Sequence, residues 1–191
     1  MRIITGTARG TKLKTLEGLN TRPTTEMCKE GVFSAIQFEL HDRSVLDLFG
    51  GCGQMALEAL SRGAERAVIV DSSRAACEVI KENAQKTKLM KQCRVVTSDW
   101  KEYLRGASGR DEFDLIFLDP PYQEGVLDDV LHRLQYSGVV AKGAIIICES
   151  DKDGIPNPIE GWQSKLYRYG KTYVTIVRVP EDLEPTVSEE E

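Results

Sequence analysis

The motif Asp119-Pro120-Pro121-Tyr122 follows an apolar run and combines residue types that suit chemistry on a nucleobase. An exocyclic amino group of a base is a poor nucleophile, because its lone pair is delocalised into the ring. The Asp119 carboxylate and the Pro120 carbonyl oxygen can accept its two hydrogens and direct the lone pair at an incoming methyl group, while the two prolines restrict the backbone. Tyr122 can stack on a base taken out of its helix. Because Asp-Pro-Pro alone is often only a turn, this assignment depends on the surrounding elements.

A glycine loop at residues 50–53 lies between an apolar run and a helical pattern. Gly51-x-Gly53-x-x-Ala56 fits the dinucleotide fingerprint G-x-G-x-x-G/A. Asp71 lies twenty residues after Gly51, about the distance expected of an acid that holds a ribose hydroxyl. A nicotinamide- or flavin-dependent oxidoreductase is therefore one interpretation of this loop.

Asp47, just before the loop, favours a different cofactor. A carboxylate here repels a pyrophosphate but can pair, directly or through water, with a cationic group. S-adenosylmethionine has an α-ammonium group and no phosphate, and it still requires close backbone approach and a ribose acceptor. Asp99 can accept from the adenine amino group, although a helix cap is an equally good interpretation of this residue. The predicted cofactor-binding residues are Asp47, Phe49, Gly51, Gly53, Asp71 and Asp99.

Apolar strand patterns alternate with helical patterns along most of the chain. Strands that alternate with helices require a parallel sheet, and ligands gather at the carboxyl edge of such sheets. The predicted fold is α/β, a Rossmann-like class I S-adenosylmethionine-dependent methyltransferase with a mostly parallel sheet, a C-terminal antiparallel hairpin and a small N-terminal extension. The expected strands are residues 44–49, 67–70, 94–97, 115–118 and 144–148, with a hairpin at 165–169 and 173–179. The expected helices run from the Thr24-Thr25 cap to about residue 42, and over 55–60, 76–88, 100–104 and 126–134.

Charge is distributed unevenly along the chain, whose net charge is −5. Residues 1–29 carry six basic side chains and two acidic ones, whereas residues 181–191 carry six acids and no base. We therefore divide the chain into a basic N-terminal arm at 1–22, a methyltransferase domain at 23–180 and an acidic tail at 181–191. The arm is either a solvated segment or one that binds phosphates.

Composition narrows the class of protein further. With 41% apolar and 29% charged residues, the chain can build one well-buried domain. No stretch approaches the roughly 18 apolar residues that span a bilayer, and the start lacks the layout of a signal peptide, so we expect a cytoplasmic protein. The five cysteines are irregularly spaced, which predicts free, mostly buried thiols rather than a metal site. His41 and His132 are isolated, and we assign them no catalytic or metal-binding role.

Five further stretches carry a family resemblance that covers nearly the whole chain. They are Arg2-Ile3-Ile4-x-Gly6 with Arg9-Gly10, Arg22-Pro23-Thr24-Thr25, Leu46-Asp47-Leu48-Phe49-Gly50-Gly51-x-Gly53, Glu58-Ala59-Leu60-Ser61-Arg62-Gly63-Ala64, and Phe113-Asp114-Leu115-Ile116-Phe117-Leu118 leading into the Asp-Pro-Pro-Tyr motif. The chain resembles the RsmD-type family, bacterial methyltransferases that modify the exocyclic N2 of one guanine in 16S ribosomal RNA. The resemblance implies S-adenosyl-L-methionine as cofactor and 16S rRNA as partner, within a small ribosomal subunit or an assembly particle. It also implies that Arg2, Arg9, Arg22 and Thr24 lie near the RNA or across the cofactor.

Four positions depart from the family pattern. The loop reads Gly50-Gly51-Cys52-Gly53 where Ala-Gly-Ser-Gly is more usual, and Asp71 stands where a glutamate is common. Lys29 stands at the position of a common arginine, which keeps the charge but loses bidentate phosphate geometry.

The prediction is an S-adenosylmethionine-dependent methyltransferase, monomeric, that acts on guanine N2 in small-subunit ribosomal RNA. Its predicted catalytic residues are Asp119, Pro120, Pro121 and Tyr122. An adenine-N6 methyltransferase of DNA or RNA uses a similar corner, but it usually needs a target-recognition segment for which this chain has little room. An NAD(P)-dependent oxidoreductase and an inactive ribosome-assembly binder are the alternatives from other classes.

Overall fold

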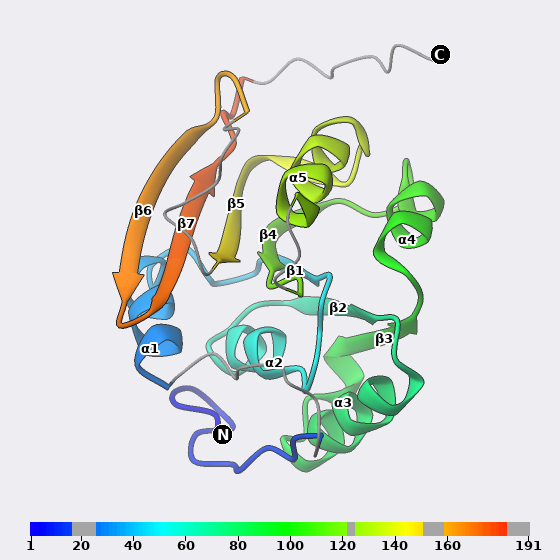
Figure 1. Cartoon of the computed structure of the whole chain (residues 1–191). Coiled ribbons are helices and arrows are strands. Elements are labelled where there is room, and N and C mark those ends of the chain that lie inside the picture. Colours follow the sequence, from blue (N-terminus) through cyan, green and yellow to red (C-terminus); the bar gives the residue numbers. More distant parts are fainter. Residues whose placement is uncertain (17–25, 122–124, 151–158, 183–191) are drawn as a thin grey trace.

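The protein is built on one seven-stranded sheet with the strand order β3-β2-β1-β4-β5-β7-β6 (Figure 1). The computed structural model describes residues 1–16, 26–121, 125–150 and 159–182. The strands are β1 (Ser44–Asp47), β2 (Arg66–Asp71), β3 (Cys93–Thr97), β4 (Phe113–Leu118), β5 (Val140–Ser150), β6 (Gln163–Tyr169) and β7 (Thr172–Arg178). The helices are α1 (Glu26–Ala35), α2 (Gln54–Ser61), α3 (Arg74–Lys86), α4 (Trp100–Ala107) and α5 (Val126–Tyr136), with a short 3₁₀ turn at Met90–Gln92.

Strands β1 to β5 are parallel, and β6 and β7 form the antiparallel hairpin that the sequence predicts. Because β7 runs opposite to β5, its first residues lie beside the last residues of β5, and Ser150 pairs with Tyr173. The turn of the hairpin therefore lies at the carboxyl edge of the parallel strands. The predicted α/β fold, with its mostly parallel sheet and C-terminal hairpin, is confirmed.

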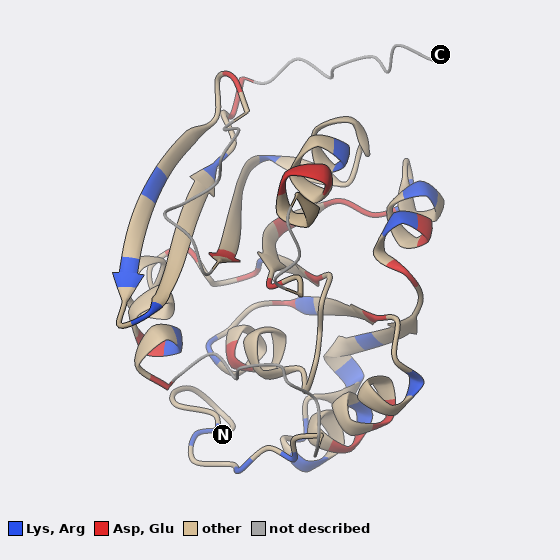
Figure 2. Cartoon of the chain, in the orientation of Figure 1, with Lys and Arg blue, Asp and Glu red and all other residues tan. Residues whose placement is uncertain are grey.

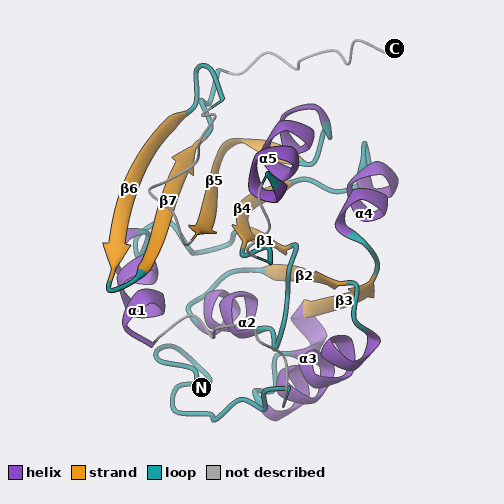
Figure 3. Ribbon diagram, viewed as in Figure 1, coloured by secondary structure: helices purple, strands orange, loops and turns teal. Residues whose placement is uncertain are grey.

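Each face of the sheet is covered by its own set of helices (Figure 3). Val45, Leu115 and Ile145 pack with α1, α2 and α3, whereas their neighbours Leu46 and Ile116 pack with α4 and α5 on the other face. Both faces are buried, which explains why these strands read as continuous apolar runs rather than as alternating ones.

Most element boundaries lie within three residues of expectation, and two differ by more. Helix α1 ends at Ala35 rather than near residue 42, although Ile36 and Leu40 are buried. The turn after α1, closed by a hydrogen bond from the Glu39 amide to the Ile36 carbonyl, keeps these side chains in the core, so their helical spacing was misleading. Strand β5 is longer than residues 144–148 and extends back to Val140.

The first sixteen residues, which belong to the basic arm, fold back on themselves with one antiparallel bridge between Arg2 and Lys12. The predicted helix start at residues 22–25 and most of the acidic tail lie outside the described residues. No helix within the described ranges is long and apolar enough to cross a membrane.

Candidate active site

Three carboxylates form a row across adjacent strands at the carboxyl edge of the sheet. Asp47 ends β1, Asp119 follows β4 and Glu149 lies near the end of β5. Phe117 on β4 pairs with Asp47 on β1 and with Ile147 on β5. Asp119 and Glu149 therefore lie side by side, two residues farther along their strands than the level of Asp47. We call these three residues the carboxylate row. Because side chains alternate between the two faces of a strand, all three carboxylates belong to the face of the sheet that α1 and α2 cover.

Burial and nearby negative charges raise the pKa values of two members of the carboxylate row, Asp119 and Asp47. Burial raises the pKa of Asp119 well above its usual value, and the negative charges of Glu149 and then Asp47 raise it further. Burial likewise raises the pKa of Asp47 from 3.8 to about 7, with a smaller contribution from Asp71. Backbone N–H groups of Phe49 and Ala56 oppose that rise because they stabilise the ionised form of Asp47. The free protein therefore holds an acidic site that a cationic ligand would stabilise.

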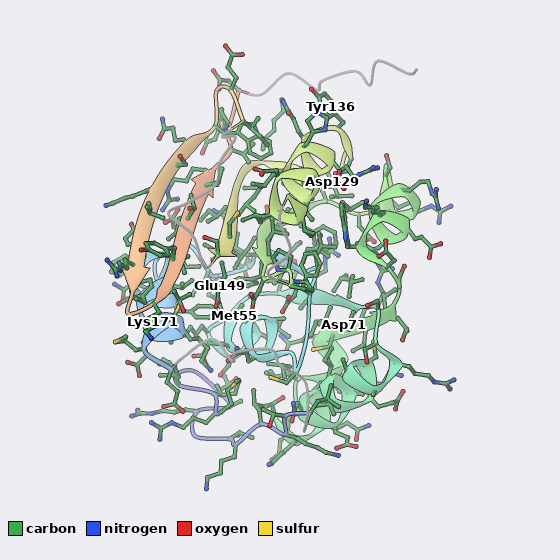
Figure 4. All side chains as sticks on the ribbon, in the orientation of Figure 1. Met55, Asp71, Asp129, Tyr136, Glu149 and Lys171 are labelled. Atoms are coloured by element: carbon green, nitrogen blue, oxygen red, sulfur yellow. The ribbon has the colours of Figure 1, made fainter. Side chains whose placement is uncertain are left out.

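Glu149 is the member of this row that the sequence analysis missed. Its side chain is 8% exposed, and its charge also raises the pKa of the neighbouring Cys28 thiol, after burial, to about 12. The sequence carried the same signal as at Asp47 and Asp119, an acid directly after an apolar strand. Figure 4 labels Glu149 at the end of β5 and Asp71 farther along the same edge of the sheet.

The glycine loop after β1 turns sharply and is held by Asp71. Gly51 and Gly53 have φ angles of 55° and 79°, which favour glycine, and the Gly53 amide donates to the Gly50 carbonyl at 2.6 Å. One oxygen of Asp71 accepts from the Gly51 amide at 2.9 Å and the other from Ser73 at 2.8 Å. Asp71 thus fixes the loop, and its remaining lone pairs can accept from a ribose hydroxyl.

Asp99 has a structural role in the described geometry. It is the N-cap of α4, and its side chain accepts from the Lys101 amide at 2.8 Å. The helix-cap interpretation of Asp99 is therefore correct, and adenine recognition by the exposed carboxylate stays a prediction. Phe49, also predicted to contact the cofactor, has its ring centroid 6.5 Å from that of Trp100.

A second group of buried charges fastens the N-terminal arm to α2. The Glu58 carboxylate accepts from the backbone amides of Ile4 at 2.7 Å and Thr5 at 3.0 Å. The same carboxylate pairs with Lys29 at 3.3 Å and with Arg62 at 2.8 Å. We call Glu58, Lys29 and Arg62 the arm clamp. Lys29, which stands where an arginine is common in the family, is fully buried and faces Glu58.

Two further contacts complete the attachment of the arm. A Cβ on Gly6 would lie 1.6 Å from the Ser61 carbonyl oxygen, so only glycine allows the arm to approach α2 this closely. Asn83 donates to the carbonyl oxygens of both Lys14 and Cys52 at 2.9 Å. Asn83 therefore joins the arm to the glycine loop, which no motif in the sequence indicated.

The other predicted site residues are distributed as follows. Pro120 is buried and Pro121 is exposed, whereas Tyr122, Arg22 and Thr24 lie outside the described residues. Arg2 is exposed and pairs with Glu26 at 3.2 Å, and Arg9 is exposed on the arm. The structure thus brings together the acids at the strand ends and leaves the substrate contacts of the arm as predictions.

Similar proteins are found for almost the whole chain. The chain is 36% identical to the putative rRNA methyltransferase YlbH of Bacillus subtilis, over 93% of this chain and 98% of that protein. It is 33% identical to the ribosomal RNA small subunit methyltransferase D of Escherichia coli, over 85% of this chain and 81% of that protein.

Solved structures give the same picture. The putative methyltransferase yhhF from Escherichia coli matches with a TM-score of 0.85 and 31% identity, over 95% of this chain and 99% of that one. An RNA methyltransferase from Salinibacter ruber, in complex with S-adenosyl-L-homocysteine, matches with a TM-score of 0.64 at 14% identity, over 87% of this chain and 99% of that one, which shows a shared fold alone. The family model described as conserved hypothetical protein 95 matches residues 1–178. The chain therefore belongs to this family, the RsmD-type family that its motifs resemble.

Proposed function

We propose that the protein transfers a methyl group from S-adenosylmethionine to the exocyclic N2 of a guanine in 16S ribosomal RNA. The observation that carries the proposal is the carboxylate row, in which Asp119, at the Asp-Pro-Pro corner, lies next to Asp47 beside the glycine loop. Relatives named as ribosomal RNA methyltransferases support the substrate class.

The proposed cofactor site is made by β1, the glycine loop and the end of β2. S-adenosylmethionine supplies an electrophilic methyl group on a sulfonium centre, and it carries a second positive charge on its ammonium group. Asp47 is 4% exposed and has a raised pKa, so it gains a counter-charge when such a cation enters. The turned backbone at Gly51 and Gly53 allows close approach, and Asp71 offers acceptor oxygens to a ribose. This donor set suits a cationic ligand and disfavours a pyrophosphate.

The proposed chemistry requires orientation more than a strong base. The N2 lone pair attacks the methyl carbon in line, the carbon–sulfur bond breaks, and the attacked nitrogen loses its proton to solvent. Asp119 and the Pro120 carbonyl accept from the amino group, and Asp119 stabilises the positive charge that develops on nitrogen. Both acceptors are held by a backbone that two prolines restrict.

Glu149 favours guanine over adenine. The edge of guanine that carries N2 presents two kinds of donor, the N2 amino group and the N1–H, whereas N1 of adenine is an acceptor. Two adjacent carboxylates, Asp119 and Glu149, can accept from both donors of guanine. With adenine, Glu149 would face a lone pair. A further test follows from 2-aminopurine, which keeps the N2 amino group but has no N1–H.

The first experiment offers undermodified small subunits and an unmodified 16S rRNA transcript to the protein with labelled cofactor and maps the methylated atom. Methylation of guanine N2 is expected, and methylation of an adenine would overturn the proposal. Calorimetry distinguishes the oxidoreductase alternative, because saturable binding of NAD without binding of S-adenosylhomocysteine would contradict the proposed cofactor.

The second experiment replaces the mapped guanine by 2-aminopurine. Wild-type protein is expected to methylate 2-aminopurine about ten- to a hundredfold more slowly than guanine, the size of one well-made base contact. Glu149→Gln is expected to narrow this ratio, because an amide can donate to N1. An unchanged ratio in the variant would remove Glu149 from base selection while leaving the mapped reaction in place.

A further inference from the structure

The β6–β7 hairpin has a charge composition unlike the rest of the protein. Residues 163–178 contain Lys165, Arg168, Lys171 and Arg178 and no acidic residue, within a chain of net charge −5. Arg178 is occupied by Glu39, with which its guanidinium makes two hydrogen bonds. Figure 2 shows basic residues along both strands of the hairpin and no acidic residue between them.

The three remaining cations are exposed and lie at different heights along the hairpin. In the part of the chain that the structure describes, no ion pair joins Lys165, Arg168 or Lys171 to a carboxylate. Lys165 lies over the Tyr167 ring at 5.2 Å, and Arg168 over the Tyr173 ring at 5.4 Å on the opposite face. Lys171 lies with Gly170 in the turn between β6 and β7. Arg168 and Lys171 thus lie at or near the turn of the hairpin and Lys165 lies farther back along β6. We call these three residues the hairpin cations.

The register places this end of the hairpin beside the carboxylate row. Cys148 on β5 pairs with both Leu118 on β4 and Thr175 on β7, and Thr175 pairs with Leu166 on β6. Arg168 therefore lies two residues beyond this level, toward the edge where Asp119 stands. With neighbouring strands about 4.8 Å apart, three strand spacings put it on the order of 14 Å from the Asp-Pro-Pro corner. Figure 4 labels Lys171 at the end of the hairpin on the side of Glu149.

The carboxylate row and the hairpin cations have opposite charges, so they act in opposite ways on a polyanion such as RNA. The row repels phosphates, so a nucleic acid that presents a base to Asp119 needs positive charge just outside the row. We propose that Lys165, Arg168 and Lys171 bind backbone phosphates of the ribosomal RNA that flank the target nucleotide. This inference rests on the proposed function and extends it to a surface outside the N-terminal arm.

A different explanation applies to cations on an edge strand, which can protect against pairing with another chain. Strand β6 is an edge strand, and Lys165 fits that explanation. Lys171 does not, because it lies in the turn between β6 and β7 and not on the edge strand. The two explanations differ in a measurable property, since phosphate contacts release counterions and edge protection does not.

The test is the triple variant Lys165→Gln, Arg168→Gln and Lys171→Gln, titrated with an unmodified 16S rRNA transcript over a range of KCl concentrations. The matched control is Lys86→Gln, Lys88→Gln and Lys91→Gln, which removes three exposed cations near the end of α3 and the start of β3, at the opposite edge of the sheet. The slope of log K against log salt is negative, and each lost phosphate contact makes it shallower by about 0.7 on single strands. In the hairpin variant we expect a slope that is shallower by about 2 and an RNA affinity that is lower by tenfold or more. The control should stay close to wild type in both quantities.

Two outcomes would overturn the inference. One is a hairpin variant whose slope equals that of the control, and the other is a variant that self-associates in size-exclusion chromatography while its slope is unchanged. S-adenosylhomocysteine affinity, measured by calorimetry, verifies that the variant is folded. The salt titration does not require turnover, so a wild-type protein that methylates neither transcript nor subunit would count against the proposed function and leave the hairpin result interpretable.

Discussion

The protein buries carboxylates in two places that differ in how their charge is balanced. In the arm clamp, Glu58 accepts from two backbone amides and pairs with Lys29 and Arg62. In the carboxylate row, Asp47 and Asp119 lie near other acids, and burial together with mutual repulsion raises their pKa values. Glu58 is therefore satisfied within the chain, whereas the proposed function has a cationic ligand supply the charge that balances Asp47.

This difference separates a structural acid from a functional one. A buried charge that has its partners holds a fold together, because removing any partner leaves the rest uncompensated. A buried acid without a cation beside it makes the free protein less stable, and this unfavourable free energy is relieved when a cation binds next to it. The arm clamp also explains the Glu58-Ala59-Leu60-Ser61-Arg62-Gly63 stretch, which needs no direct role in catalysis.

The largest expected effect is on turnover in Asp119→Asn. This change keeps the shape of the side chain and removes the charge that stabilises the developing positive nitrogen, so we expect kcat to fall by about 10²- to 10³-fold. S-adenosylhomocysteine affinity should change little, and the melting temperature should not fall, because repulsion with Glu149 is relieved. Single-turnover kinetics, calorimetry and thermal unfolding measure the three quantities. Wild-type turnover in this variant would remove Asp119 from the mechanism.

The opposite behaviour is expected in the arm clamp. Glu58→Gln leaves Lys29 buried without its counter-charge, which costs about 3–5 kcal/mol of unfolding free energy. The melting temperature should drop by on the order of 10 °C. The double variant Glu58→Gln with Lys29→Met removes both charges and should recover part of the loss. A stable Glu58→Gln protein would show that the two sites do not differ in the way proposed.

A smaller effect is expected from the pH dependence of cofactor binding. The pKa of Asp47 rises from 3.8 to about 7 in the folded protein, so between those values the folded state holds a proton that the unfolded state releases. At this site stability therefore falls as pH rises from about 4 to 7, whereas the affinity for the ammonium group of S-adenosylhomocysteine rises. Below pH 7 the affinity should fall by up to about tenfold per unit. In Asp47→Asn, calorimetry should find weak binding that varies little with pH.

The sequence predicted the sheet and most of the strand-end acids, because apolar runs that stop at an acid are a local signal. Asp47, Asp71, Asp99 and Asp119 were all found in this way, and Glu149 carries the same pattern. The partners of Lys29 and Asn83 could not be predicted, because they lie more than twenty residues away in the sequence and meet only in the folded chain. The charge of Lys29 gave no sign in the sequence that this side chain is buried against Glu58.

The smallest effect concerns the arm that the clamp holds in place. Deleting the arm would also remove the partners of Glu58, so a point substitution is the cleaner change. Arg9 is exposed, whereas the guanidinium of Arg2 is already paired with Glu26. We expect Arg9→Gln to lower the salt slope of RNA binding by about 0.7–0.9, the contribution of one phosphate contact, and Arg2→Gln to lower it less. Equal slopes for wild type and Arg9→Gln would confine the arm to a structural role, and the hairpin cations would then carry the phosphate contacts without it.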